Sequence, residues 1–180
     1  TVGILLEHAA LLREKSGVLL NVSAVSARDK TQDRGIDLSS FAWIDDAREL
    51  ACRDDVDMVI ELIGGADGIA YDIAIDTLSR GKDFVTANKA LIATHGHELA
   101  KLAEDNGAGL RFEASVAGGI PILKAINDGL VGNEISDLYG ILNGTCNYIL
   151  TRMEREGGDF DAILKDAQDI GFAEADPCFD

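Results

Sequence analysis

Apolar residues recur along this chain at two different spacings. In some stretches they return every three or four positions, as on one face of an α-helix, and in others they form short β-rich runs typical of buried strands. Helical spacing occurs at residues 4–16, 45–52, 67–80 and 95–106, and strand-like runs occur at 18–26, 57–63, 83–86 and 109–113. Ser16-Gly17 is expected to end the first helix, and residues 29–40 form a polar loop.

The alternation of strands and helices predicts an α/β fold, a Rossmann-like doubly wound parallel sheet with helices on both faces. Such sheets bind ligands at the carboxyl ends of their strands. Small or polar residues follow every predicted strand, at Ser26-Ala27-Arg28, Gly64-Gly65, Ala87-Asn88-Lys89 and Ala114-Ser115. This is the expected layout of a nucleotide crevice.

The pattern changes after about residue 130. A longer strand is predicted at 135–142, followed by acidic helices at 147–156 and 159–170, the second closed by Gly171. We expect residues 1–132 to form an NAD(P)-binding domain whose first strand is missing, and 133–180 to begin a second α+β domain for substrate binding and catalysis. Glu174, Asp176 and Asp180 crowd the end of the chain, and carboxylates on a stiff turn suit a cationic group such as a substrate ammonium.

Composition narrows the class of protein. The 180 residues are 47% hydrophobic and 27% charged, which describes a globular chain with a substantial core. A formal net charge of −16 argues against nucleic acid and anionic membranes, which require basic patches. The three cysteines are widely spaced, so we predict reduced thiols in a cytoplasmic protein rather than a disulfide framework or a zinc site. The sequence has neither an apolar run of transmembrane length nor a signal-peptide pattern.

The start of the chain fits a dinucleotide fold. We interpret Gly3, preceded by Val2 and followed by a helix, as the last glycine of a phosphate-binding fingerprint. The position that would contact the adenosine ribose falls near Ser26, which is not acidic. Arg28, with Lys30 nearby, would instead pair with a 2′-phosphate, which favours NADP over NAD. A solvated surface arginine fits Arg28 equally well.

Lys89 directly follows a buried strand and begins a helix, which places it in the predicted crevice. There it would orient a carbonyl or supply a proton. The alternative is a lysine in solvent at a helix terminus, and the sequence alone favours that alternative. Gly64, Gly65, Asn88 and Ser115 occupy the same strand ends and are candidate cofactor contacts.

Two further segments offer polar backbone groups. Glu113 precedes the small-residue turn Ala114–Pro121, whose carbonyls, with one carboxylate, suit a hard cation. Composition alone favours the simpler interpretation, in which Glu113 caps the helix that follows. In Asn143-Gly144-Thr145, amide donors and a hydroxyl precede a helix, as in a cradle for an anionic substrate group. Thr145 is also an ordinary helix N-cap residue, and both interpretations can hold together.

These segments together resemble the homoserine dehydrogenase family. The resemblance rests on pieces that span nearly the whole chain: Thr1-Val2-Gly3, the run Val59–Gly65, Thr86–Leu91, EASVAGGIPI at 113–122, GILNGTCNYIL at 140–150 and GFAEADP at 171–177. It implies NAD(P)-dependent interconversion of L-aspartate 4-semialdehyde and L-homoserine, in threonine and methionine biosynthesis. It also implies a homodimer built through the second domain.

The resemblance assigns roles position by position. It implies that Lys89 lies in the cofactor and substrate crevice and takes part in catalysis. It also implies that Glu113 binds a sodium ion together with the carbonyls of Val116, Gly118 and Ile120. It implies substrate contacts at Gly144, Thr145, Gly171 and Glu174, with Glu174 holding the homoserine ammonium.

The chain also departs from the family pattern. Phe172 stands where a tyrosine is usual, so a hydroxyl is lost. The family's proton-donating lysine would lie beyond Asp180, and the family enzyme is about twice this length. We therefore expect a piece lacking both ends and inactive by itself. Two other readings stay open: another two-domain NAD(P)-dependent amino-acid dehydrogenase, and a non-catalytic nucleotide-binding module.

Overall fold

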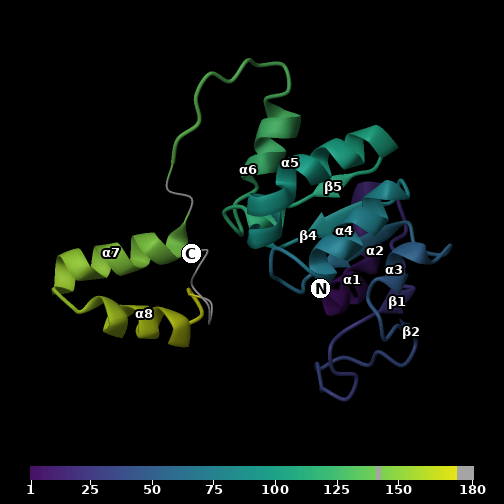
Figure 1. Cartoon of the computed structure of the whole chain (residues 1–180), viewed down its shortest axis with the longest axis horizontal. Coiled ribbons are helices and arrows are strands. Elements are labelled where there is room, and N and C mark those ends of the chain that lie inside the picture. Colours follow the sequence, from purple (N-terminus) through teal and green to yellow (C-terminus); the bar gives the residue numbers. More distant parts are fainter. Residues whose placement is uncertain (141–142, 174–180) are drawn as a thin grey trace. The chain divides into compact units, whose positions relative to one another are not determined.

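The structure is a computed structural model that describes residues 1–140 and 143–173 (Figure 1). The chain divides into two compact units, each described by itself. Unit 1 comprises Thr1–Ile60, Asp67–Val85 and His97–Leu110, and unit 2 comprises Glu61–Ala66, Thr86–Gly96 and Arg111–Asp180.

Two helices and two strands open the chain, and from β2 (Ala42–Trp43) to β5 (Leu110–Arg111) strands and helices alternate. In order they are α1 (Val2–Glu7), α2 (Ala9–Ser16), β1 (Ala24–Val25), β2 (Ala42–Trp43), α3 (Glu49–Cys52), β3 (Met58–Glu61), α4 (Ile69–Ser79), β4 (Asp83–Thr86), α5 (Lys89–Asn106) and β5 (Leu110–Arg111). Short turns of helix follow, η1 (Glu113–Ser115), α6 (Ile122–Lys124) and the π-helical η2 (Ala125–Gly129), and then the longer α7 (Gly144–Glu156) and α8 (Phe160–Asp169).

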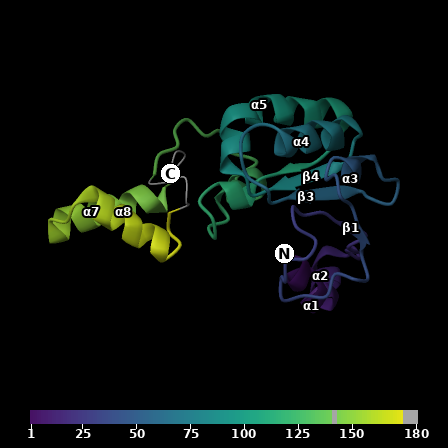
Figure 2. The ribbon, with the colours of Figure 1, turned by 60° about the horizontal axis from the view of Figure 1, so that its bottom comes forward.

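The strands form parallel sheets, which confirms the predicted α/β class. β1 pairs with β2 in parallel, and β3, β4 and β5 lie side by side in that order. Asp83 N–H donates to the carbonyl of Asp57 at 3.0 Å, and Ala87 N–H donates to that of Glu61 at 3.4 Å. Because the offset is the same at both ends, β3 and β4 run in parallel. Figure 2 shows α4 and α5 on one face of these strands.

The core of unit 1 lies between that face and its helices. Phe84 of β4 is fully buried, as are Leu78 of α4 and Leu99 of α5. Burial of such a side chain contributes about 1.5–3 kcal/mol. Thr77 is equally buried, yet its hydroxyl has no hydrogen-bond partner within the described chain. An unpaired buried hydroxyl is unfavourable, so Thr77 contributes by packing and not by polar contact.

The predicted helix at 4–16 is wrong as a single helix. It is interrupted at His8, where the backbone leaves helical geometry between α1 and α2. Neither segment has a buried residue. Since most helix stability in proteins comes from packing an apolar face, little holds the two segments in one straight helix.

The predicted strands were longer than those in the structure, most of all at two places. The run 18–26 forms strand only at Ala24–Val25, because its partner β2 is equally short. Residues 135–140 have no regular structure, and 141–142 lie outside the described residues. A strand needs a neighbour for its backbone groups. The described residues place none beside 135–140, and Tyr139 is 91% exposed.

The helix predicted from His95 begins earlier, at Lys89. The carboxamide oxygen of Asn88 accepts the N–H of Leu91 at 3.1 Å, which is the bond of a helix N-cap. This cap starts α5 directly at the end of β4. Asn88 and Lys89 are therefore held in a helix start and not in a loop.

Helices α7 and α8 are joined by a short turn and pack against each other in antiparallel orientation (Figure 1). We call this pair of helices the α7–α8 hairpin. Ile149, Ile163, Ala167 and Ala173 form its buried core. Gly157 ends α7 in the left-handed conformation, which glycine adopts without strain. In the described part of the chain, no helix combines the length and the apolar character that crossing a membrane requires.

Candidate functional site

The ends of β3 and β4 are joined by a buried carboxylate. Glu61, only 2% exposed, accepts hydrogen bonds from the N–H groups of Ile63 at 2.5 Å and Gly64 at 3.1 Å through Oε1. Its other oxygen, Oε2, accepts the hydroxyl of Thr86 at 2.5 Å. The last residue of β3 therefore binds both the glycine turn that follows it and the last residue of β4.

Asn88 continues this network into α5. Its N–H donates to the hydroxyl oxygen of Thr86 at 2.9 Å, and its Nδ2 donates to the carbonyl of Gly65 at 2.7 Å. The structure thus brings Gly65 and Asn88 together, two of the predicted cofactor contacts. Gly64 and Gly65 have φ of +90° and +84°, which only glycine adopts readily, and both are exposed. Lys89, half-buried, is the next residue and begins α5.

The roles of Glu61 and Thr86 were missed in the sequence. The signal was present: β3 alternates exposed and buried positions, and Glu61 occupies a buried one. A carboxylate at an inward position of an apolar strand must find donors, because an unpaired buried charge is very costly. Searching the neighbouring strand end for a hydroxyl would have identified Thr86.

The remaining cofactor candidates lie in unit 1, apart from Ser115. Val2 and Gly3 form the first turn of α1, and Arg28 is exposed in the loop after β1. The ammonium of Lys30 lies over the ring of Trp43, 5.6 Å from its centroid, in a cation–π contact. Ser115, in unit 2, is half-buried and donates its hydroxyl to the carbonyl of Phe112 at 2.7 Å.

Glu113 caps a helix, as one of the two interpretations predicted. Its carboxylate accepts the N–H of Leu123 at 3.0 Å and that of Lys124 at 2.9 Å, at the start of α6. Each oxygen keeps a further lone pair, so capping leaves the carboxylate able to bind a cation as well. The described residues hold no cluster of three or more His, Cys, Asp or Glu side chains suited to a metal ion. A cation here would depend on carbonyl oxygens.

The turn after Glu113 has an unusual backbone. Ala117 has φ of +48°, a conformation that non-glycine residues seldom adopt, and its carbonyl accepts the N–H of Ile120 at 2.9 Å. Strained residues of this kind concentrate at ligand sites. The turn contains Val116, Gly118 and Ile120, and their carbonyls with the Glu113 carboxylate would offer only oxygen ligands, which suit a hard cation and not zinc or copper.

Asn143, not Thr145, is the N-cap of α7. The side-chain oxygen of Asn143 accepts the N–H of Cys146 at 2.8 Å. Thr145 lies inside the helix, is 6% exposed, and donates its hydroxyl to the carbonyl of Phe172 at 2.6 Å. This hydroxyl therefore fixes the far end of the hairpin, whereas Gly144 remains exposed at the start of α7.

Gly171 closes α8 as predicted, with φ of +81°. The turn after it folds back, because the N–H groups of Phe172 and Ala173 both donate to the carbonyl of Ala167, at 2.8 and 3.1 Å. The ring of Phe172 meets that of Tyr148 edge-on, with centroids 5.2 Å apart. Glu174, the proposed ammonium ligand, lies outside the described residues.

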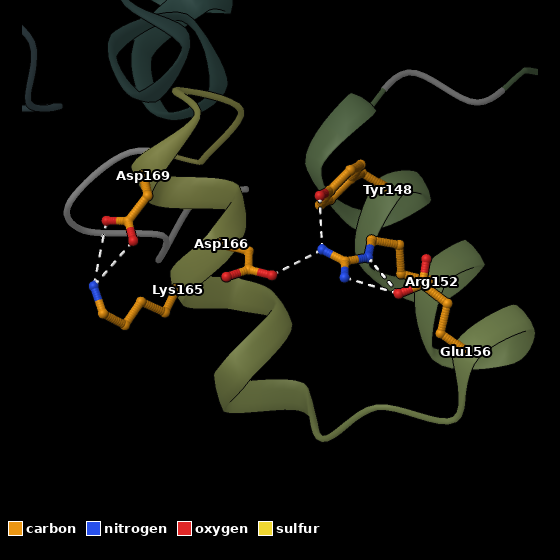
Figure 3. A network of polar contacts seen from close by, with 6 residues as sticks. All are labelled: Tyr148, Arg152, Glu156, Lys165, Asp166 and Asp169. Carbon is orange, nitrogen blue, oxygen red and sulfur yellow. Dashed lines mark hydrogen bonds and ion pairs between the residues drawn. The ribbon is translucent and has the colours of Figure 1, made fainter.

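Arg152 ties the two helices of the hairpin together (Figure 3). From α7 it donates to Glu156 at 2.8 Å and to the hydroxyl of Tyr148 at 2.9 Å, and it reaches across to Asp166 of α8 at 2.9 Å. The hydrogen bonds that Arg152 donates, first to Glu156 and then to Tyr148 and Asp166, raise the pKa of Arg152 above its ordinary value. The guanidinium thus supports Tyr148, against which Phe172 of the closing turn packs.

Comparison with known proteins identifies the family of this chain. A family model described as "Homoserine dehydrogenase, NAD binding domain" matches residues 3–113, and one described as "Homoserine dehydrogenase" matches residues 121–180. The chain belongs to the homoserine dehydrogenase family. The homoserine dehydrogenase of Neisseria gonorrhoeae is 44% identical over 98% of the chain, which spans 40% of that relative's length.

Solved homoserine dehydrogenases share the fold. The crystal structure of the enzyme from Thiobacillus denitrificans superposes with a TM-score of 0.86 and 37% identity, covering 99% of this chain and 41% of that one. A hyperthermophilic archaeal homoserine dehydrogenase in complex with NADPH superposes with a TM-score of 0.64 and 26% identity, covering 96% of this chain and 48% of that one. The chain thus carries a nicotinamide-dinucleotide-binding fold of this family.

Shortening a side chain in the hairpin core tests how much that core stabilises the hairpin. Ile163→Ala is expected to lower the free energy of unfolding by about 2–5 kcal/mol, because it removes buried methyl groups and leaves a cavity. Lys165→Ala on the exposed side of α8 is the matched control, with an expected change within about 0.5 kcal/mol. Urea titration of the complete protein measures both, and equal losses would show that this core does not stabilise the hairpin.

Proposed function

We propose that the complete protein transfers hydride between NADP(H) and the substrate pair L-aspartate 4-semialdehyde and L-homoserine. The observation that carries this proposal is the match of two successive homoserine dehydrogenase models, which together cover nearly all of the chain. The network at the ends of β3 and β4 supports it, because ligands of such folds bind beyond the carboxyl ends of the strands.

The proposed chemistry needs two groups beside the carbonyl of the semialdehyde. When bound, the reduced nicotinamide supplies hydride to the carbonyl carbon, and the oxygen takes up a proton to give the alcohol. Lys89 would polarise this oxygen with its charge. The family resemblance assigns the principal proton donor to a lysine beyond Asp180, so we propose that the residues of this chain supply cofactor binding and polarisation.

The substrate would be held by the second part of the chain. We propose contacts at Gly144, Thr145 and Gly171, and an ion pair between Glu174 and the homoserine ammonium. Because the hydroxyl of Thr145 donates to Phe172, its contribution would be the backbone N–H at the start of α7. The boundary at 132/133 is part of this proposal: residues 1–132 bind the cofactor and 133–180 begin the catalytic domain.

Cofactor preference and the cation site complete the proposal. The positive charge of Arg28 supports NADP over NAD. Val2 and Gly3, in the first turn of α1, would also contact the cofactor. Glu113 with the carbonyls of Val116, Gly118 and Ile120 would bind sodium, and the positive φ of Ala117 supports a built turn there. We further propose a cytoplasmic homodimer that acts in threonine and methionine biosynthesis.

Oxidation of NADPH by the complete protein tests the proposal. Addition of L-aspartate 4-semialdehyde is expected to cause a substrate-dependent loss of the absorbance of the reduced nicotinamide. The loss should be slower when NADH replaces NADPH. Turnover with another amino-acid aldehyde, but not with this one, would favour a different two-domain dehydrogenase. Saturable binding of NADPH without turnover of any substrate would favour a nucleotide-binding module.

A further inference from the structure

The side chain of Glu61 links segments beyond its own strand, because it bonds both the turn after β3 and the last residue of β4. Among the described residues, its side-chain oxygens accept hydrogen bonds from the N–H groups of Ile63 and Gly64 and from the hydroxyl of Thr86. Two of the three donors are backbone N–H groups of the turn that leads to Gly65. The carboxylate therefore fixes the orientation of successive peptide groups where the backbone of β3 becomes exposed.

Thr86 makes this network directional. Its hydroxyl has a single hydrogen, which it donates to Glu61, so the N–H of Asn88 meets an oxygen lone pair. Asn88 in turn donates to the carbonyl of Gly65 and accepts the N–H of Leu91. The contacts form a closed ring from β3 through β4 to the start of α5 and back to the glycine turn. Polar rings in which every member is paired rigidify their surroundings.

We propose that Glu61 is the positioning residue of the cofactor site: through Thr86 and Asn88 it holds the Gly64-Gly65 turn and the start of α5 in one arrangement, and so sets where Lys89 lies. The inference rests on the proposed function only in taking a nicotinamide dinucleotide as the ligand. Glu61 itself is buried and needs no contact with cofactor or substrate. It acts on both ligand-facing segments, because each is hydrogen-bonded to the ring.

The test uses the complete protein and four variants. Glu61→Gln keeps the shape of the side chain but replaces one acceptor oxygen with a donor, and Thr86→Val removes the hydroxyl. Thr86→Ser retains it. Thr77→Val is the matched control, since Thr77 is an equally buried threonine whose hydroxyl has no partner among the described residues. The dissociation constant for NADPH is measured by fluorescence titration, and folding is followed by thermal melting.

Glu61→Gln and Thr86→Val are expected to raise the NADPH dissociation constant about ten-fold or more, which corresponds to loss of a hydrogen bond to a charged group. They should also lower kcat. Thr86→Ser is expected to bind NADPH within about two-fold of the wild type, and Thr77→Val to leave both values unchanged. If Glu61→Gln does not fold, the comparison of Thr86→Val with Thr86→Ser decides.

Two results would overturn the proposal. One is wild-type NADPH binding and kcat in Thr86→Val. The other is an equal loss of NADPH binding in Thr77→Val or Thr86→Ser, which would show that the ring contributes only general core packing. Failure of the proposed function is distinguishable. If the wild-type protein binds NADPH but reduces no semialdehyde, the proposed reaction fails while the comparison of dissociation constants still decides the role of Glu61.

Discussion

Lys89→Met in the complete enzyme is expected to lower kcat for reduction of L-aspartate 4-semialdehyde by about 10²–10³-fold. Methionine has a similar length but no charge, so it would fill the same space without polarising the carbonyl oxygen. Removing one group that stabilises developing charge in an active site has effects of this size. The structure supports a defined position for Lys89, because it follows the capping residue Asn88 and is half-buried.

Steady-state kinetics with NADPH measures this effect, and Lys101→Met is the matched control. Lys101 is an exposed lysine on the same helix, α5, so its loss is expected to leave kcat unchanged. A normal kcat in Lys89→Met together with weaker NADPH binding would limit Lys89 to cofactor binding. A normal kcat together with normal binding would remove it from the site.

Glu174→Gln is expected to raise the KM for L-homoserine by about 10–100-fold. A hydrogen bond between charged partners is worth about 1.5–3 kcal/mol, and glutamine keeps the shape of glutamate while losing its charge. The effect on kcat should be smaller, because the ammonium is bound similarly in the ground state and the transition state. The measurement is the oxidation of homoserine at saturating NADP.

Glu154→Gln is the control for this experiment. Glu154 is exposed on α7, so the same chemical change there should leave KM unaltered. An unchanged KM in Glu174→Gln would remove Glu174 from the substrate site. An equal increase in both variants would indicate a general effect of charge on substrate binding.

Sequence patterns predicted the regular parts of the fold because local features determine them. β4 occurs at Asp83–Thr86 as expected, and Gly171 closes α8 in the left-handed conformation. Both follow from short-range rules: a buried apolar run for the strand, and freedom of positive φ for the glycine. The parallel alternation likewise follows from the order of helices and strands.

What the sequence did not predict depends on contacts between residues far apart in the chain. The helical spacing was counted only from His95, whereas α5 begins at Lys89, the residue at which a helix start was also predicted. Of the two interpretations of Thr145, the N-cap is wrong, because its hydroxyl donates to the carbonyl of Phe172, just after the end of α8. The partner of Glu61, Thr86, lies on the adjacent strand. The sequence can offer candidates for such pairings, but which candidates meet depends on how the strands and helices pack together.

The Arg152 contacts make the stability of the α7–α8 hairpin depend on ionic strength. Asp166, the carboxylate on α8, is 57% exposed in its side chain, so dissolved salt screens its attraction to Arg152. The neutral bonds of the closing turn, from Thr145 to Phe172 and from Ala173 to Ala167, have no such dependence. Under the substrate contacts proposed above, affinities for homoserine measured at different salt concentrations would compare hairpins of different stability, so salt concentration is held fixed when variants are compared.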